Sequence, residues 1–418
     1  MSSTIEVKLA DLCQLVSVQV DPQATPGLPY IGLEHVPPGR FCTLATGVAS
    51  DALSAKFLFQ AGDILYGKLR PYLDKAVLAD GAGVCTTELL VLRPKAGIDS
   101  RYIAGVVHSP AFIDHAMSGV TGAHHPRTSW HHISQFTLPA HNKDERHGIA
   151  DLLCQVDALL LICETACDTA VKIKQSAMSA LFTRGLRGEA QKETEIGWVP
   201  ESWDVVLLGQ LGRVGNGSTP KRSIPAYWTD GTYPWLTSAK VYDREITKAD
   251  QFVTPTALTE CHLPKVQPGA LLMAITGQGK TLGHCAVLQV EATVSQHVAY
   301  VQTDLTRANP GFVRGYLETQ YDYLRQVGAG GGSTKGALTC SFLRSLPIPL
   351  PSKPEQDEVV EVLDAIDRKI ALHQQKRAVL EDLFKALLHK LMTGEIDVND
   401  LDLQALSARE PATEGSLA

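Results

Sequence analysis

The sequence predicts an α+β protein made of two tandem repeats, each a mixed α/β globular domain followed by one long helix. Similar blocks recur in the same order about 205–210 residues apart. Stretches rich in Gly and Pro alternate with stretches almost free of both, and the latter carry apolar residues at helical spacing. The 418 residues are 44% hydrophobic and 20% charged, which is ordinary for globular proteins and excludes fibrous and disordered chains.

The repeat consists of five pairs of blocks that follow one another in the same order in both halves. Identity within each pair is low, so the shared order is what indicates a duplication. The paired blocks are 27–36 with 231–241, 59–65 with 266–272, 134–139 with 344–349, 145–161 with 355–371, and 188–189 with 394–395.

The first part of each repeat is predicted to be the mixed α/β domain. Short apolar runs bounded by turn residues indicate strands, and two amphipathic stretches that open at Ser100 and at Asn309-Pro310 indicate helices. A Pro-marked segment ends each domain. The expected strands are 57–69, 75–79, 87–94, 269–276 and 297–303, and the expected helices are 100–117 and 310–327.

The second part of each repeat is predicted to be one long helix. Residues 143–184 contain no Pro and a single Gly, and their apolar residues alternate in steps of three and four, the heptad spacing of a coiled coil. A matching helix is expected from about 353 or 355 to 392. The expected seam is Ile149, Leu152, Val156, Leu159, Cys163, Ala166, Ala170, Ile173, Ala177 and Ala180 in the first helix, and Ile366, Ile370, Leu380, Phe384, Leu387 and Leu391 in the second, with His373 and Arg377 on the same stripe.

An apolar stripe of this length must be buried against something. The other long helix of the same chain is the obvious partner, so we expect the two helices to pair as an antiparallel intramolecular coiled coil. The alternative is that each helix packs on its own globular domain.

Charge is distributed unevenly over the five segments into which the sequence divides. The formal net charge is −7, and residues 351–418 carry 14 Asp and Glu against 8 Lys and Arg. A strongly cationic coat is therefore excluded, but a local basic groove is not. The segments are two globular domains (1–142 and 196–350), the first helix with its linker (143–195), the second helix (351–397), and an acidic tail expected to be disordered (398–418).

The residue pattern favours a cytoplasmic location. We expect no export signal, because no cationic and apolar stretch opens the sequence, and no membrane span, because no apolar run approaches 18 residues. Nine Cys, an odd number without framework spacing, indicate reduced thiols.

With these features the chain resembles the specificity subunit of a type I restriction–modification enzyme, over residues 1–397. The first half is more divergent than the second and lacks the Ile-Gly-Trp-Val-Pro phrase that opens the second domain. The segments that carry the resemblance are the helix entrances 138–153 and 348–367, the exit 387–396, and, in the second domain, 196–212, 219–236 and 330–351.

The resemblance implies a non-catalytic subunit that recognises a bipartite duplex DNA site. Residues 1–142 and 196–350 would be target-recognition domains, each taking one half-site, and the helices would dock two copies of a DNA-methyltransferase subunit. The chain itself would bind no cofactor: S-adenosylmethionine, ATP and magnesium are expected on partner subunits. Whether a restriction translocase–nuclease subunit joins stays open.

Candidate DNA-binding residues lie in polar loops bounded by Gly or Pro. His, Arg, Lys, Ser and Thr donate hydrogen bonds to phosphates and base edges, and Gln favours adenine. Solvated loops without a ligand are the alternative interpretation. The candidates are Lys68 and Arg70 after a strand, His124, His125, Arg127 and Thr128 in one loop, Ser333, Thr334 and Lys335 in its counterpart, Gln278 and Lys280 in a second hairpin, and Lys221 and Arg222 beside Tyr227 and Trp228.

Other chemical motifs are weak. Residues 274–281 approach a phosphate-binding loop, but Ala274 replaces its first Gly, and the residues that follow are predicted to form a strand where the motif needs a helix. The segment Asn309-Pro-Gly-Phe312 only echoes a methyltransferase loop and is better interpreted as a helix N-cap. Cys163 and Cys167, and the His pairs at 124–125 and 131–132, lack a second pair at zinc spacing, so we expect no metal site.

Two rival functions remain. One is a coiled-coil structural or protein-interaction scaffold without DNA specificity, and the other is a nucleotide-dependent enzyme that uses residues 274–281.

Overall fold

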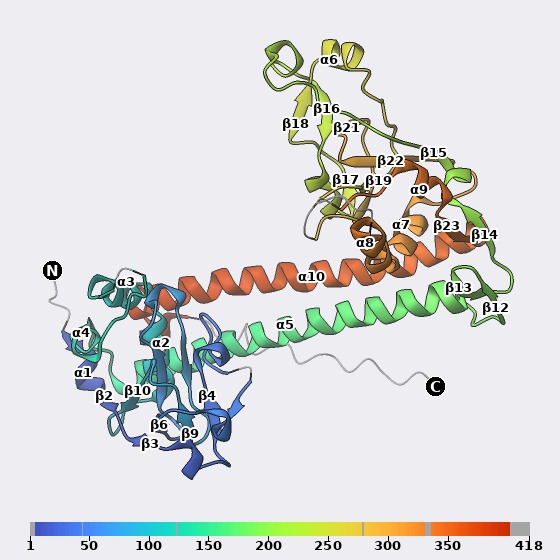
Figure 1. Ribbon diagram of the computed structural model, residues 1–418. Helices are drawn as coiled ribbons and strands as arrows, with labels where there is room; N and C mark the ends of the chain where they lie inside the picture. The colour runs from blue at the N-terminus through green and yellow to red at the C-terminus, as the bar shows by residue number, and fades with distance from the viewer. Residues whose placement is uncertain (1–4, 44, 123, 278–279, 331–335, 402–418) are drawn as a thin grey trace. The chain divides into compact units, whose positions relative to one another are not determined.

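The chain divides into two compact units (Figure 1). Residues 1–166 together with 373–418 form unit 1, and residues 167–372 form unit 2. The five-segment division predicted from the sequence groups residues differently and stays a prediction. The computed structural model describes residues 5–401 except for 44, 123, 278–279 and 331–335.

Unit 1 contains two main sheets and a small two-stranded one. The order β2-β10-β7-β8 is antiparallel throughout, whereas the order β3-β6-β9-β4-β5 contains one parallel pair, β9 with β4. Helix α2 contacts the first of these sheets. The strands are β1 (Glu6–Lys8), β2 (Cys13–Val16), β3 (Gln19–Val20), β4 (Pro29–Ile31), β5 (Gly47–Val48), β6 (Lys56–Phe59), β7 (Ile64–Gly67), β8 (Ala76–Leu78), β9 (Gly83–Cys85), β10 (Leu89–Pro94) and β11 (Thr137–Pro139). The short helices are α1 (Leu9–Leu12), α2 (Ser100–His108), α3 (Pro110–Ser118), α4 (Trp130–Ile133), η1 (Pro22–Ala24), η2 (Leu33–His35), η3 (Ala49–Asp51), η4 (Pro71–Leu73) and η8 (Val398–Asp400).

Unit 2 contains the corresponding sheets, with β15-β22-β19-β20-β17 as the largest and β18-β16-β21 beside it. The strands are β12 (Gln191–Thr194), β13 (Gly197–Pro200), β14 (Asp204–Leu207), β15 (Gly212–Asn216), β16 (Tyr233–Leu236), β17 (Glu245–Ile246), β18 (Gln251–Val253), β19 (Leu271–Ala274), β20 (Cys285–Leu288), β21 (Thr293–Val294), β22 (Val298–Thr303) and β23 (Pro347–Leu350). The short helices are α6 (Pro255–Glu260), α7 (Pro310–Thr319), α8 (Tyr321–Ala329), α9 (Cys340–Ser345), η5 (Leu208–Gln210), η6 (Pro225–Tyr227) and η7 (Ser238–Tyr242).

The two units have the same connections, which supports the duplication seen in the sequence. Strands β2, β10, β7 and β8 correspond in order and direction to β15, β22, β19 and β20. The parallel pair β4 with β9 recurs as β16 with β21. Gly67 pairs with Leu89 and Ala274 pairs with Val298, so this register gives a residue-by-residue equivalence between the units.

Both short helical stretches predicted from the sequence are broken in two. The expected helix 100–117 is α2 followed by α3, because Pro110 has no N–H for a continuous helix and the Ser109 hydroxyl accepts from the Phe112 N–H at 3.3 Å to start a new one. The expected helix 310–327 is likewise divided at Gln320, which has non-helical backbone angles.

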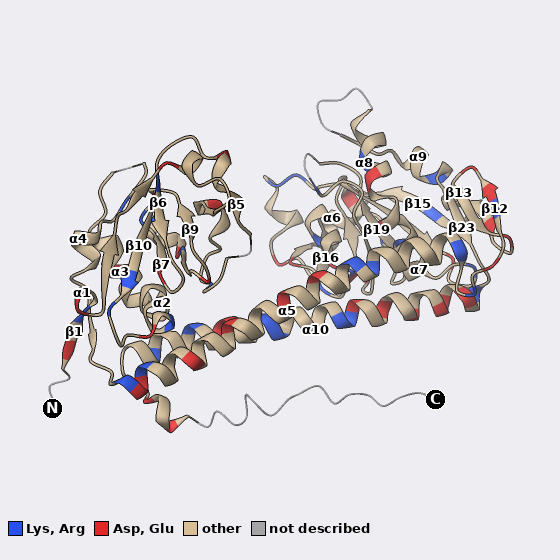
Figure 2. Cartoon of the chain, turned by 90° about the horizontal axis from the view of Figure 1, so that it is seen from below, with Lys and Arg blue, Asp and Glu red and all other residues tan. Residues whose placement is uncertain are grey.

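The two long helices are α5 (Lys143–Arg184) and α10 (Lys353–Met392), as the sequence predicts. Asn142 begins α5 with a reciprocal cap, because its side chain accepts from the Glu145 N–H at 3.0 Å while the Glu145 carboxylate accepts from the Asn142 N–H at 2.7 Å. Gly185, in the left-handed region, ends the helix. Acidic and basic side chains are interspersed along both helices (Figure 2). No described helix is long and apolar enough to cross a membrane.

Within each unit the two long helices share one core and run in opposite directions. In unit 1 the first half of α5 and the second half of α10 bury Val156 and Phe384 in the same cluster. In unit 2 the second half of α5 and the first half of α10 bury Phe182 and Leu363 together. Each half also packs on the globular part of its unit, which is the alternative interpretation of the stripe. A continuous coiled-coil seam stays a prediction.

The predicted seam of α5 is wrong beyond Ala170. Ile173 is 54% exposed and Ala180 is also exposed, whereas Met178 and Leu181 are buried. A straight α-helix has 3.6 residues per turn, so its buried face drifts by roughly 20° per heptad from a 3.5-residue pattern. By the fourth heptad the drift is close to the angle between neighbouring residues, so the buried positions are Met178 and Leu181 instead of Ala177 and Ala180.

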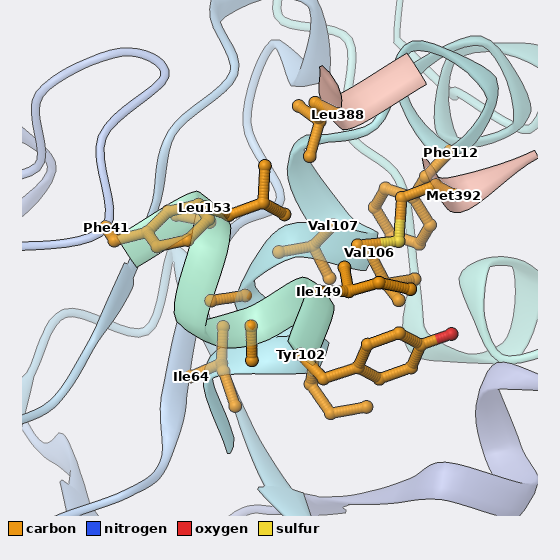
Figure 3. Packing of buried hydrophobic residues seen from close by; sticks show 14 of the residues in the cluster. Phe41, Ile64, Tyr102, Val106, Val107, Phe112, Ile149, Leu153, Leu388 and Met392 are labelled. Carbon is orange, nitrogen blue, oxygen red and sulfur yellow. The ribbon is translucent and has the colours of Figure 1, made fainter. Parts of the chain in front are cut away.

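Helix α2 packs against both long helices, with its Val106 near Ile149 of α5 and Met392 of α10 (Figure 3). A Cβ atom at Gly105 of the same helix would lie 2.7 Å from Met392 Cε and 3.0 Å from Leu153 Cδ1 of α5. The equivalent Gly315 of α7 faces Leu363 and Phe182 in unit 2. The missing side chain allows the three helices of each unit to meet.

Ion pairs connect each globular part to a long helix one turn beyond this contact. In unit 1 the Arg40 guanidinium lies 3.0 Å from Asp157 and 2.6 Å from Glu164, both on α5. In unit 2 Arg244 lies 2.5 Å from Asp367 of α10. Burial raises the pKa of Asp157, and the attraction of Arg40 opposes that shift.

Replacing Gly105 with Leu is expected to lower the free energy of unfolding of unit 1 by about 1–3 kcal/mol, because the added side chain overpacks the junction of α2, α5 and α10. Hydrogen–deuterium exchange of the β7 and β10 amides in denaturant measures this effect. Gly81→Leu is the matched control, since nothing lies within 4 Å of a Cβ at that position. Equal protection in both variants would contradict the packing described.

Candidate nucleic-acid interface

In unit 1 the backbone brings two predicted loops together into one surface. Leu69, after β7, forms an antiparallel bridge with Arg127. The Arg70 N–H donates to the Pro126 carbonyl at 2.7 Å, and the Thr128 N–H donates to the Lys68 carbonyl at 3.0 Å. The candidates at 68–70 and 124–128 therefore belong to one site.

Lys68 and Arg70, which follow β7, differ from Arg127 in their side-chain contacts. Lys68 and Arg70 make no ion pair with any residue the structure describes. Arg70 adopts the left-handed region at φ 53° directly before Pro71, a conformation that costs free energy for a non-glycine residue. The loop is thus held in an unfavourable backbone shape that presents a half-buried guanidinium.

Arg127 is already engaged within unit 1. Its Nε lies 3.0 Å and its Nη2 3.4 Å from the two carboxylate oxygens of Glu88, and its Nη1 donates to the His125 carbonyl at 3.2 Å. This bidentate ion pair stabilises the loop. Arg127 would therefore have to break its hydrogen bonds to Glu88 before it could contact DNA.

The remaining candidates of this loop differ in exposure. His124 and His125 are exposed. Thr128 is 4% exposed, and its hydroxyl has no hydrogen-bond partner among the described residues. A buried hydroxyl does not reach a ligand at the surface, so the structure does not favour a direct DNA contact by Thr128.

Unit 2 has the same loop pairing with different side chains. Thr276 bridges to Ala337, and the Leu338 N–H donates to the Ile275 carbonyl at 2.8 Å. Register therefore places Ala337 where unit 1 has Arg127. Lys280 is exposed, and its carbonyl accepts from the Tyr321 hydroxyl at 2.5 Å. The candidates Gln278, Ser333, Thr334 and Lys335 lie outside the described residues.

The predicted basic–aromatic cluster of unit 2 is present. The Arg222 guanidinium lies 3.6 Å from the Trp228 ring centroid and 5.0 Å from that of Trp235, and it donates to Gln251 at 2.5 Å. Lys221 is exposed, and its carbonyl accepts from Trp228 Nε1 at 3.2 Å. The aromatic rings thus fix the orientation of Arg222.

Unit 2 contains a chain of hydrogen-bonded polar side chains that was not predicted from the sequence. Thr219 donates to Gln296, Gln296 Nε2 lies 3.2 Å from His297 Nε2, and His297 Nδ1 lies 2.5 Å from Thr276 Oγ1. These residues come from three separate loops. Of these residues, only Gln296 and His297 lie in the turn before β22, where a comparison with the turn before β10 of the other repeat could have indicated them.

The turn before β22 in unit 2 is equivalent to the turn before β10 in unit 1. The Lys68 N–H donates to the Glu88 carbonyl at 3.0 Å, and the Ile275 N–H donates to the His297 carbonyl at 3.0 Å. His297 of unit 2 therefore corresponds to Glu88 of unit 1, and Gln296 corresponds to Thr87. The same backbone frame carries an ion pair in one unit and a neutral hydrogen-bonded chain in the other.

Asn309 and Cys163 take the simpler roles predicted from the sequence, a helix N-cap and a core residue. The next described element after β19 is strand β20, so the described residues that follow β19 do not form the helix of a phosphate-binding loop. Asn309 caps α7 by accepting from the Gly311 N–H at 2.8 Å. Cys163 is 2% exposed in the unit 1 core. No group of three or more His, Cys, Asp or Glu among the described residues is placed to hold a metal.

Part of the chain matches a known family model. The model of the type I restriction modification DNA specificity domain matches residues 200–382. The type I restriction enzyme MjaIX specificity subunit of Methanocaldococcus jannaschii is 31% identical over 219 residues, 49% of this chain and 48% of that protein. The chain therefore spans about half the length of this relative. The provisionally assigned MjaX specificity subunit of the same organism is 24% identical over 392 residues, 89% of this chain and 88% of that protein.

The fold is similar to that of a solved structure. The S subunit of a type I restriction–modification system from M. genitalium superimposes with a TM-score of 0.61 at 14% identity, covering 93% of this chain and 96% of that one. This likeness concerns the fold alone, and it extends over both units.

Replacing Glu88 with Ala is expected to loosen the loop pairing of unit 1, because Arg127 loses its carboxylate partner. The pair is partly exposed, so the expected loss is at most about 1 kcal/mol, or about a fivefold faster exchange of the Arg70 and Thr128 amides. Hydrogen–deuterium exchange measures it. The exposed Asp80, replaced with Ala, is the control, and unchanged exchange in the Glu88 variant would show that the ion pair does not hold the loop.

Proposed function

We propose that this chain is a type I restriction–modification specificity subunit, that is, a DNA sequence-recognition subunit without catalytic activity of its own. In this proposal it binds a bipartite duplex DNA site, with one globular part for each half-site. Catalysis belongs to partner subunits.

The observation that supports the proposal most strongly is a pair of loops, joined by the same backbone hydrogen bonds in both units but carrying different side chains. We call this loop pairing the backbone frame. In both units the loop after the central strand pairs with the loop before a short helix, through equivalent bridges at Leu69 and Thr276. Unit 1 presents cations and an ion pair there, and unit 2 presents amide, imidazole and hydroxyl groups. Loops with the same backbone pairing but different side chains suit the recognition of two different half-sites in comparable geometry.

The partners follow from the same proposal. The long helices would dock two copies of a DNA-methyltransferase subunit, which would supply S-adenosylmethionine, and a restriction subunit would bring ATP and magnesium where a system has one. Exposed large apolar side chains on the long helices, such as Ile162 and Val379 at 62% and 67% exposure, suit protein docking. Nine free thiols suit a reducing cytoplasm as the place of action.

Replacing Lys68 and Arg70 together with Gln is expected to weaken DNA binding on every sequence. Each cation that neutralises a phosphate releases counterions, so the slope of log affinity against log salt should fall by about 2. Fluorescence anisotropy with duplex DNA at several salt concentrations measures it, on the full chain with its methyltransferase subunit.

The charge-matched control is Lys143→Gln with Arg146→Gln at the start of α5, where no loop pairing occurs. A salt slope identical for both double variants would contradict a phosphate contact by Lys68 and Arg70.

Replacing residues 196–350 with the corresponding domain of another specificity subunit is expected to change one half-site only. Long-read sequencing of genomic DNA from cells that express the complex displays the methylated motif and therefore both half-sites. A change in both halves would show that the units do not recognise DNA independently. Absence of any sequence-specific methylation or binding by the unmodified complex would instead favour a scaffold without DNA specificity.

A further inference from the structure

We propose that Gln296 recognises an adenine in the half-site bound by unit 2. The inference rests on the proposed function and adds to it a residue, a base and a means of orientation. No candidate from the sequence includes this residue.

Three loops of unit 2 converge on the Gln296 side chain. Thr219, after β15, donates to its Oε1 atom, and its Nε2 lies 3.2 Å from His297 Nε2. His297 is in turn held by Thr276, after β19, at 2.5 Å. Gln296 and His297 are both exposed, so the amide is fixed by its neighbours and still open to a ligand.

The bonds leave Gln296 with one donor and one acceptor. A primary amide has two N–H groups and two lone pairs on its oxygen, and the chain uses one of each. Exchanging the oxygen and nitrogen of the amide does not change this count, because Nε2 would then donate to Thr219 and Oε1 would accept from His297. No other described residue bonds the two remaining groups.

One free donor beside one free acceptor matches adenine. In the major groove adenine presents an acceptor at N7 next to a donor at N6, and a Gln amide pairs with both. Guanine presents two acceptors there, cytosine a single donor, and thymine an acceptor with a methyl group. A fixed amide loses little side-chain entropy on binding, which favours discrimination.

The residue bridged to Thr276 in unit 2 is smaller than its equivalent in unit 1. Ala337, bridged to Thr276, stands where unit 1 has the larger Arg127. Thr87 is the unit 1 equivalent of Gln296, and beside it Glu88 is occupied by Arg127. The adenine contact is therefore expected in the half-site of unit 2 and not in that of unit 1.

The test uses the full chain in complex with its methyltransferase subunit. A duplex library randomised over both half-sites is selected for binding and sequenced. The unmodified complex should select adenine at one position that Gln296→Ala no longer distinguishes, with a loss of preference of about 10- to 100-fold at that position alone. Replacing that adenine with 7-deazaadenine should weaken the unmodified complex and not the variant.

Gln289→Ala is the matched control, because Gln289 is exposed in the same unit and its side chain is bonded to no described residue. It should keep the full preference. Gln296→Glu is the second variant: its carboxylate only accepts, so the preference should move from adenine toward cytosine. A role limited to loop structure would not change which base is preferred.

Three outcomes would overturn the inference. An unchanged adenine preference in Gln296→Ala, or an equal loss of binding on all sequences, would overturn it while leaving the proposed function intact. Absence of sequence-selective binding by the unmodified complex would overturn the proposed function itself.

Discussion

The close contact of one short helix with two long helices fixes each globular part on its support. Gly105 in unit 1 and Gly315 in unit 2 occupy equivalent positions, and each meets side chains from both α5 and α10. One turn beyond Leu153, Asp157 pairs with Arg40 of the globular part. The apolar contact supplies most of the stability, because the attraction within a buried ion pair is largely offset by desolvation of its charges. The ion pair contributes orientation, since a charge without its partner is costly there.

Because the long helices support each globular part, the side chains of the paired loops after β7 and β19 can differ greatly between the units. Lys68 and Ile275 donate to equivalent carbonyls, and the bridges at Leu69 and Thr276 coincide in register. Backbone hydrogen bonds do not depend on side-chain identity, so the frame tolerates an ion pair in one unit and a neutral chain in the other. Duplication followed by divergence at these few positions is enough to give two unlike surfaces on one scaffold.

The sequence predicted what is local and periodic, and it missed what depends on distant pairing. The long helices and the order of the repeats were predictable, because both depend on composition and spacing within short windows. The seam failed at Ile173, where the 3.5-residue pattern departs from a straight helix. The polar chain joins Thr219 to Gln296 across 77 positions, and no spacing rule connects them. Thr128 resembled a surface residue in the sequence, and only tertiary packing shows that it is buried.

In the proposed function, the two units would take different parts in DNA binding. Lys68 and Arg70 have no partner ion among the described residues, so neutralising phosphates costs them no existing bond. Arg127 must give up Glu88 before it contacts DNA, which makes its net contribution small and dependent on finding an equally good bidentate partner. Gln296 carries no charge, so its contribution is discrimination between bases and not attraction to the duplex. In the proposed function, Lys68 and Arg70 of unit 1 would supply salt-dependent affinity, and Gln296 of unit 2 would supply selectivity that salt affects little.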